Sequence, residues 1–114
     1  MPGCLFCNIV AGTTAAQIVY DNAHVVAFKD IRPMAPVHAL VIPKVHITGI
    51  HEATAEHAEA LGHVLLAARD VAEKLGLHTT GYRTVINNGA DAGQSVFHLH
   101  VHVLGGRAMA WPPG

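Results

Sequence analysis

The sequence has little charge and no excess of either sign. Only 13% of its 114 residues are Asp, Glu, Lys or Arg, and the formal net charge is −1 with neutral histidines. A protein that binds duplex nucleic acid gathers positive charge against the phosphates, so we expect no nucleic-acid partner. Hydrophobic residues make up 51% of the chain. That fraction fits a well-filled core or, equally well, a buried self-interface.

Long apolar runs are also missing. No run approaches the 18 residues of a membrane span, and no charged N-terminal segment precedes an apolar stretch as in a signal peptide. We therefore expect a cytoplasmic protein with no membrane contact. The two cysteines, Cys4 and Cys7, are in that compartment more often metal ligands or free thiols than a disulfide. The length fits one domain over residues 1–114.

Four short segments rich in β-branched and aromatic residues predict strands: residues 17–20, 24–29, 37–42 and 82–87. The first two flank Asp21-Asn22 and predict a hairpin. Residues 5–10 predict a short helix or turn that ends at Gly12. With a fifth strand near the C-terminus, this pattern predicts an α+β fold with a mostly antiparallel five-stranded sheet. The order of the strands stays open.

Residues 53–75 predict the one long helix. Apolar residues recur there at steps of three and four and form a stripe: Leu61, Leu65, Ala68, Ala72 and Leu75. Val64 and Val71 widen this stripe enough to cover both a sheet and a partner molecule. Gly76 follows the stripe and fits a left-handed helix cap.

Three histidines, His98, His100 and His102, alternate with apolar residues near the C-terminus. On a strand this spacing places all three imidazoles on one face. Alternate Cα atoms are about 6.7 Å apart, so the outer two are about 13 Å apart. An imidazole holds a metal only about 6 Å from its Cα. Two of the three can therefore share a metal ion, but all three cannot.

A glycine-containing loop directly precedes the histidines. Gly89, Gly93, Gln94 and Ser95 can bring backbone amides close to an anion, and imidazolium groups also favour phosphate. Loop and histidines together therefore indicate phosphate chemistry, with a metal site as the alternative.

At this point the sequence resembles a known family. The segment His98–Leu104 is similar to the histidine-triad (HIT) motif, in which three histidines alternate with apolar residues. Four further segments resemble the Hint branch of that superfamily: 28–33, 36–44, 93–96 and the terminal Trp-Pro-Pro-Gly at 111–114. The resemblance covers nearly the whole chain and implies a HIT-like fold with one long helix and a short N-terminal helix.

The resemblance implies a homodimeric hydrolase of purine nucleoside 5′-phosphoramidates. His100 would be the nucleophile that attacks the α-phosphorus and forms a covalent nucleotidyl-histidine. For that attack the other ring nitrogen must carry the proton, and we expect a backbone carbonyl to accept it. The residues similar to the family's phosphate binders are His102, Asn87, Ser95 and the backbone of Gly93 and Gln94. His38 matches a histidine that assists proton transfer, although a buried strand histidine can also be purely structural.

The nucleoside-binding residues also come from the resemblance. Asp30 matches a carboxylate that accepts both ribose hydroxyls. Four apolar residues match the slot for the base: Phe6, Ile9, Phe28 and Ile31. Trp111 matches a tail residue that reaches toward the partner subunit's active site. The dimer is expected to form through the long helix and a neighbouring strand.

Cys4 and Cys7 form a Cys-x-x-Cys, which commonly supplies half of a tetrahedral zinc site. A thioredoxin-like redox pair needs a βαβ unit that this sequence lacks, whereas two free structural cysteines stay possible. Bacterial-type HIT relatives carry such a pair and bind zinc with two histidines. By that resemblance His46 and His98 complete a structural zinc site.

Three other functions stay open. One is a dinucleoside polyphosphate hydrolase of the neighbouring HIT branch, the second a non-catalytic nucleotide-binding or interaction module, and the third a metallohydrolase. The Trp-Pro-Pro-Gly tail and Gly93-Gln94-Ser95 favour the Hint branch.

Overall fold

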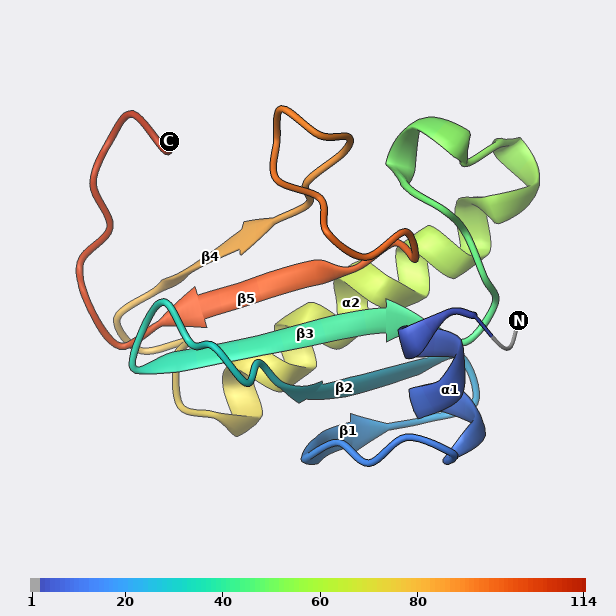
Figure 1. Cartoon of the computed structure of the whole chain (residues 1–114). Helices are drawn as coiled ribbons and strands as arrows, with labels where there is room; N and C mark the ends of the chain where they lie inside the picture. The colour runs from blue at the N-terminus through green and yellow to red at the C-terminus, as the bar shows by residue number, and fades with distance from the viewer. Residues whose placement is uncertain (1–2) are drawn as a thin grey trace.

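All five strands form one antiparallel sheet in the order β1-β2-β3-β5-β4 (Figure 1). The computed structural model describes residues 3–114. The strands are β1 (Ile18–Asp21), β2 (Val25–Lys29), β3 (Val37–Pro43), β4 (Tyr82–Val85) and β5 (Val101–Gly105). The predicted α+β class and the five strands are confirmed. The structure also gives the strand order that the sequence left open, because the last strand, β5, lies between β3 and β4.

Helix α2 (Ala58–Lys74) lies behind the sheet (Figure 1) and follows two short 3₁₀ turns, η1 (Ile50–Glu52) and η2 (Ala55–His57). Its buried residues are Val64, Ala67, Ala68, Val71 and Ala72. They pack against alternate residues of the three central strands: Val25, Ala27, Ala39, Val41, Val101 and Val103.

The predicted stripe on α2 was wrong at one position. Leu65 is 53% exposed, because each helical residue turns about 100° from the last and Val64 already faces the sheet. The helix also begins later than predicted, at Ala58, since residues 55–57 form a 3₁₀ turn. The cap prediction is confirmed, because Gly76 has a φ of 77°.

Helix α1 (Leu5–Ala11) covers the opposite face of the sheet, in front of β2 and β3 in Figure 1. Phe6 and Ile9 of this helix pack on four residues of those strands: Val26, Phe28, Leu40 and Ile42. The helix ends at Gly12, whose φ of 79° is the left-handed conformation that glycine adopts without strain. The predicted short N-terminal helix is confirmed.

The histidine segment is only partly a paired strand. β5 begins at Val101, so His98 and His100 lie in the chain that leads into it. The predicted alternation nevertheless holds, because Leu99, Val101 and Val103 are buried on the α2 side. The three histidines therefore lie on the α1 side. No helix within residues 3–114 is long and apolar enough to cross a membrane.

Candidate active site

The proton on His100 is fixed by a backbone carbonyl. Its Nδ1 lies 2.7 Å from the carbonyl oxygen of His98. A carbonyl only accepts hydrogen bonds, so Nδ1 carries the proton and Nε2 keeps a lone pair. The ring is buried, with 6% of the residue exposed, and the Phe6 ring meets it edge to face at 5.1 Å between centroids. The expected backbone acceptor for His100 is therefore present.

His38 and His102 form a second, directional hydrogen-bond chain. The backbone N–H of Met34 donates to His38 Nδ1 over 3.0 Å, so the His38 proton sits on Nε2. That Nε2 lies 2.9 Å from His102 Nδ1. His102 Nδ1 therefore accepts, and its Nε2 carries a proton. The sheet brings the two rings together, because His102 pairs with Leu40 and His38 is its diagonal neighbour on β3.

Burial keeps these rings neutral. It lowers the pKa of His102 to about 4, with the nearby His100 and His38 adding to the effect. Burial also lowers the pKa of His38, although the Asp30 carboxylate opposes that shift. A neutral His102 still offers one N–H donor, which suits an oxygen of a bound phosphate.

Asp30 connects this histidine chain to a cavity. Its Oδ2 lies 3.4 Å from His38 Nε2, and its side chain is 18% exposed. Its Oδ1 accepts the backbone N–H of Arg32 over 2.8 Å. The carboxylate lies at the wall of a cavity of about 420 Å³. Most of the residues predicted to bind the nucleotide line this same cavity: Phe6, Ile9, Phe28, Asp30, Ile31, Ser95, His100 and His102.

The loop that precedes the histidines uses most of its polar groups internally. The amides of Gly93 and Gln94 donate to the carbonyls of Ala90 and Gly89. The Gln94 side chain is buried, accepts from Gly89 N–H and donates to the carbonyls of Thr48 and Val96. Of the predicted loop donors, Ser95 is the one that reaches the cavity wall. Gly93 and Gln94 thus shape the loop that presents Ser95.

Besides Gly93 and Gln94, two further predicted binding residues, Asn87 and Trp111, lie away from the cavity lining. Asn87 follows the end of β4 and is half-buried. Trp111 is 81% exposed. The centroid of its ring lies 5.9 Å from the Arg83 guanidinium carbon. Arg83 also donates to the Ala110 carbonyl. This arrangement holds the tail against β4 of the same chain.

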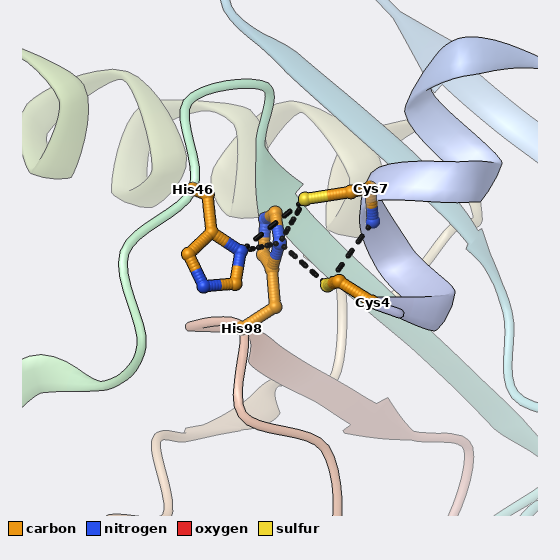
Figure 2. Close-up of side chains that lie close together, drawn as sticks. All are labelled: Cys4, Cys7, His46 and His98. Atoms are coloured by element: carbon orange, nitrogen blue, oxygen red, sulfur yellow. Dashed lines mark hydrogen bonds between the residues drawn. The ribbon is translucent and has the colours of Figure 1, made fainter. Parts of the chain in front are cut away.

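The four predicted metal ligands lie together at the N-terminal end of α1 (Figure 2). Cys4 and Cys7 belong to the start of this helix, His46 follows β3, and His98 precedes β5. The ligand atoms Cys4 Sγ, Cys7 Sγ, His46 Nδ1 and His98 Nδ1 all lie within 4.8 Å of one another. Residues far apart in the sequence therefore converge on one point.

The distances within this cluster fit a tetrahedral ion. Cys7 Sγ lies 3.2 Å from His46 Nδ1 and 3.5 Å from His98 Nδ1, and the two imidazole nitrogens are 3.1 Å apart. Zinc bonds of about 2.0 Å to nitrogen and about 2.3 Å to sulfur separate tetrahedral ligands by about 3.3 to 3.8 Å. His98 Nε2 donates to the Pro43 carbonyl over 2.8 Å, so its Nδ1 lone pair is free to point at an ion.

The protonation states of Cys7 and His98 affect how this cluster would bind a metal ion. Burial and the hydrogen bond with Cys4 raise the pKa of the Cys7 thiol, so a bound metal has to displace its proton. Burial lowers the pKa of the His98 ring, which leaves the ring in its neutral, ligating form. The four residues therefore fit a zinc ion by donor type and spacing, and binding would release the Cys7 proton.

A second group, Asp30, His38 and His102, has similar spacing, but its inward-facing His38 nitrogen is protonated, whereas that of His98 in the cysteine cluster is not. Its ligand atoms also lie within 4.8 Å of one another. The His38 nitrogen that faces the group is the protonated one, because Met34 N–H occupies the other nitrogen. A protonated nitrogen has no lone pair for a metal. This group is therefore suited to hold protons, and the cysteine cluster to hold an ion.

The family model for the HIT domain matches residues 11–109. The chain belongs to the HIT domain family. An uncharacterized HIT-like protein of Synechococcus elongatus is 54% identical over 110 residues, which cover 96% of each chain. A 14 kDa zinc-binding protein of Zea mays is 48% identical over 112 residues, covering 96% of this chain and 87% of that protein. The crystal structure of a HIT family hydrolase from Legionella pneumophila has a TM-score of 0.96 and 46% identity, covering 98% of this chain and 100% of that one.

Sequence reasoning missed several parts of this HIT site. The Met34 amide and the Pro43 carbonyl orient His38 and His98, respectively. Almost every residue has these backbone groups, so the sequence does not show which of them bond to a histidine ring. Leu40 lines the cavity, and its place two residues after His38 on one strand could have shown it. The predicted Hint branch, as opposed to the HIT family, stays a prediction.

Proposed function

We propose that the protein hydrolyses purine nucleoside 5′-phosphoramidates through a covalent nucleotidyl-His100. One observation carries the proposal: the His98 carbonyl holds the proton on His100 Nδ1, which leaves an unprotonated Nε2 in a cavity that Asp30 and Ser95 also line. The Nε2–phosphorus bond forms while the phosphorus–nitrogen bond breaks. The departing nitrogen takes a proton from the His38–His102 pair and leaves as an amine. The oxygen of a water molecule then bonds to the phosphorus as the Nε2–phosphorus bond breaks, and one proton of that water restores the pair.

The other residues have separate roles in this proposal. His102 Nε2–H and the Ser95 hydroxyl donate to the phosphate oxygens as negative charge builds. His38 keeps the proton of His102 on the nitrogen that faces the phosphate. Asp30 accepts the ribose hydroxyls, and Phe6, Ile9, Phe28 and Ile31 enclose the base. The preference for purines rests on the family resemblance.

The proposal is tested by trapping the intermediate. The protein is mixed with adenosine 5′-phosphoramidate, quenched within the first turnovers and examined by intact mass and peptide mapping. We expect an adenylyl adduct on His100 and none in His100→Ala. Turnover without an adduct, or an adduct on another histidine, would contradict the mechanism. Faster hydrolysis of diadenosine triphosphate than of the phosphoramidate would instead favour the neighbouring HIT branch.

We further propose that Cys4, Cys7, His46 and His98 hold a structural zinc ion. The fit of donor types and distances described above supports this, as does the zinc-binding name of the maize relative. When bound, the ion would tie α1 to the loops before β5 and after β3 and would take no part in the reaction. Elemental analysis of protein purified without added metal should find about one zinc per chain. Its absence would contradict the proposal.

A further inference from the structure

The Asp30 carboxylate meets both the cavity of the candidate active site and a buried ring outside that cavity. Asp30 lines the cavity, where the proposed reaction places the ribose. Its Oδ2 also lies 3.4 Å from Nε2 of His38, whose side chain is only 3% exposed. His38 does not line the cavity, so the ribose meets Asp30 and not this ring. Asp30 therefore connects the ribose position to the His38–His102 pair.

The negative charge of Asp30 acts on this pair of rings. Among the residues that the structure describes, no Lys or Arg lies within ion-pair distance of Asp30. Burial lowers the pKa of both His38 and His102, and the Asp30 carboxylate opposes that shift. A nearby negative charge favours the more protonated form of its neighbours, most of all where little water is present. The carboxylate therefore makes the pair hold its protons more tightly.

The proposed reaction needs the pair to release one of those protons. In its first step the proton on His102 Nε2 passes to the departing nitrogen. The proton on His38 Nε2 can then follow over the 2.9 Å to His102 Nδ1. The pair becomes more negative by one charge beside the Asp30 carboxylate, until the water of the second step returns a proton. The charge of Asp30 therefore opposes the first step.

We propose that Asp30 couples recognition of the ribose to proton release from the His38–His102 pair. Hydroxyl groups of the ribose donate hydrogen bonds to the carboxylate and so weaken its hold on the pair. A ribonucleoside substrate thus speeds the chemical step, whereas a substrate without these hydroxyls leaves the full charge of Asp30 facing His38. The inference rests on the proposed phosphoramidase function. It makes Asp30 a positioning residue that acts through His38 and selects ribonucleosides by rate as well as by binding.

The test compares adenosine 5′-phosphoramidate with its 2′,3′-dideoxy analogue. Rapid quench and intact mass measure how fast the adenylyl adduct forms on His100 at saturating substrate. In the wild type the ribose substrate should react about tenfold faster than the dideoxy substrate. In Asp30→Asn, whose amide has no charge, the two saturated rates should agree within about twofold, and the dideoxy substrate should react about fivefold faster than in the wild type. A misfolded variant cannot produce that gain.

A second readout does not depend on turnover. The imidazole ¹⁵N resonances of His38 should differ between the complexes with AMP and with 2′,3′-dideoxy-AMP in the wild type, and this difference should vanish in Asp30→Asn.

Asp21→Asn is the matched control, because Asp21 pairs with Lys44 at 2.9 Å and lies outside the cavity lining. It should keep the wild-type ratio of the two rates. Circular dichroism and melting curves check that each variant is folded. Equal saturated rates in the wild type, with a difference in KM alone, would overturn the coupling and leave the phosphoramidase function intact. So would an unchanged ratio in folded Asp30→Asn. Absence of an adduct from both substrates in the wild type would overturn both proposals.

Discussion

At the scale of single residues, the three histidines of the triad differ because different groups hold their protons. His98 donates from Nε2 to Pro43, His100 from Nδ1 to His98, and His102 accepts at Nδ1 from His38. The same side chain thus serves as candidate metal ligand, candidate nucleophile and candidate phosphate donor. Residue type alone does not separate these roles, whereas the hydrogen-bond partners do.

The first prediction concerns His100. His100→Ala should lower phosphoramidate turnover by at least about a thousandfold, because the covalent route is lost. AMP affinity should change by less than about tenfold, since Asp30 and the base slot stay in place. Steady-state kinetics and calorimetry with AMP measure the two effects. Wild-type turnover in the variant would refute the assigned role.

The second prediction concerns pH. The pKa of His102 is about 4 in the folded protein and about 6.5 in an unfolded chain. Between these pH values His102 binds a proton in the unfolded chain but not in the folded protein. The stability that neutral His102 contributes is therefore fully present above pH 6.5 and is lost as the pH falls toward 4.

Urea unfolding at several pH values measures this effect. His102→Asn should unfold with a weaker dependence on pH than the wild type at the same metal content. His78→Asn, which changes an exposed histidine, is the matched control. Equal pH dependence in His102→Asn and the wild type would show that His102 does not contribute.

The sequence predicts which residues form the candidate site better than it predicts how they are oriented. His38, His46, His98 and His102 are recognisable by spacing and family pattern, and the structure brings them into two clusters. The orienting groups are the Met34 amide and the Pro43 and His98 carbonyls. These are present at every residue, and only the fold determines which of them face a ring.

At the scale of elements, α1 serves two sites. Cys4 and Cys7 lie at its start, and Phe6, between them, contacts His98 and His100 and lines the cavity of the candidate active site. A helix of seven residues is too short to be stable alone. Its position therefore depends on packing against β2 and β3 and on the cysteine cluster.

The third prediction follows from this double use. Cys4→Ser combined with Cys7→Ser should abolish zinc binding and weaken AMP binding by about tenfold, because the wall that carries Phe6 is no longer held. Far-UV circular dichroism should keep the sheet signal, since the core between α2 and the sheet is separate. Calorimetry with AMP measures the effect. Wild-type protein from which a chelator has removed zinc should show the same loss of AMP affinity. Unchanged AMP affinity in the double variant and in the chelated wild type would contradict the link between the cysteine cluster and AMP binding.

The fourth prediction concerns the loop before the histidines. Gln94→Ala should destabilise the fold by about 2 kcal/mol, because the half-buried Gly89 amide and the Thr48 and Val96 carbonyls lose their partner. Ser95 follows directly, so KM for the phosphoramidate should also rise. Urea unfolding and kinetics check both effects. Gln17→Ala, at an exposed glutamine, is the control and should change neither.

Element boundaries show where sequence patterns stop being informative. The stripe on α2 was wrong at Leu65, because steps of three and four fit more than one face of an Ala-rich helix. The histidine segment alternates like a strand from residue 98, but pairing begins at Val101. Periodicity reports which way side chains point, and it does not report where a neighbouring strand starts to pair.

At the scale of the whole molecule, both α2 and the edge strand β4 carry exposed apolar side chains. Leu65 and Leu66 of α2 are 53% and 51% exposed. β4 lies at the edge of the sheet, and its first residue, Tyr82, is 38% exposed. Exposed apolar surface and an open sheet edge are both typical of protein interfaces. They agree with the predicted two-fold interface through the long helix and a neighbouring strand.

The fifth prediction is therefore that the protein is a dimer at micromolar concentration and that Leu66→Arg makes it a monomer. A charge placed in an apolar interface has no partner there. Sedimentation velocity distinguishes the two states. Ile18→Lys places a charge on the opposite edge strand, β1, and should stay dimeric. A wild-type monomer would contradict the predicted interface.

The sheet order also has a consequence for how the fold is completed. β5 is the last of the five strands along the sequence, yet it pairs with β3 on one side and β4 on the other. Without it the sheet is divided and β4 has no neighbour. The same segment brings His100 beside Phe6 and His98 beside the cysteines. A chain in which β5 has not yet paired therefore has neither a complete sheet nor the candidate nucleophile in place, and the pairing of β5 supplies both.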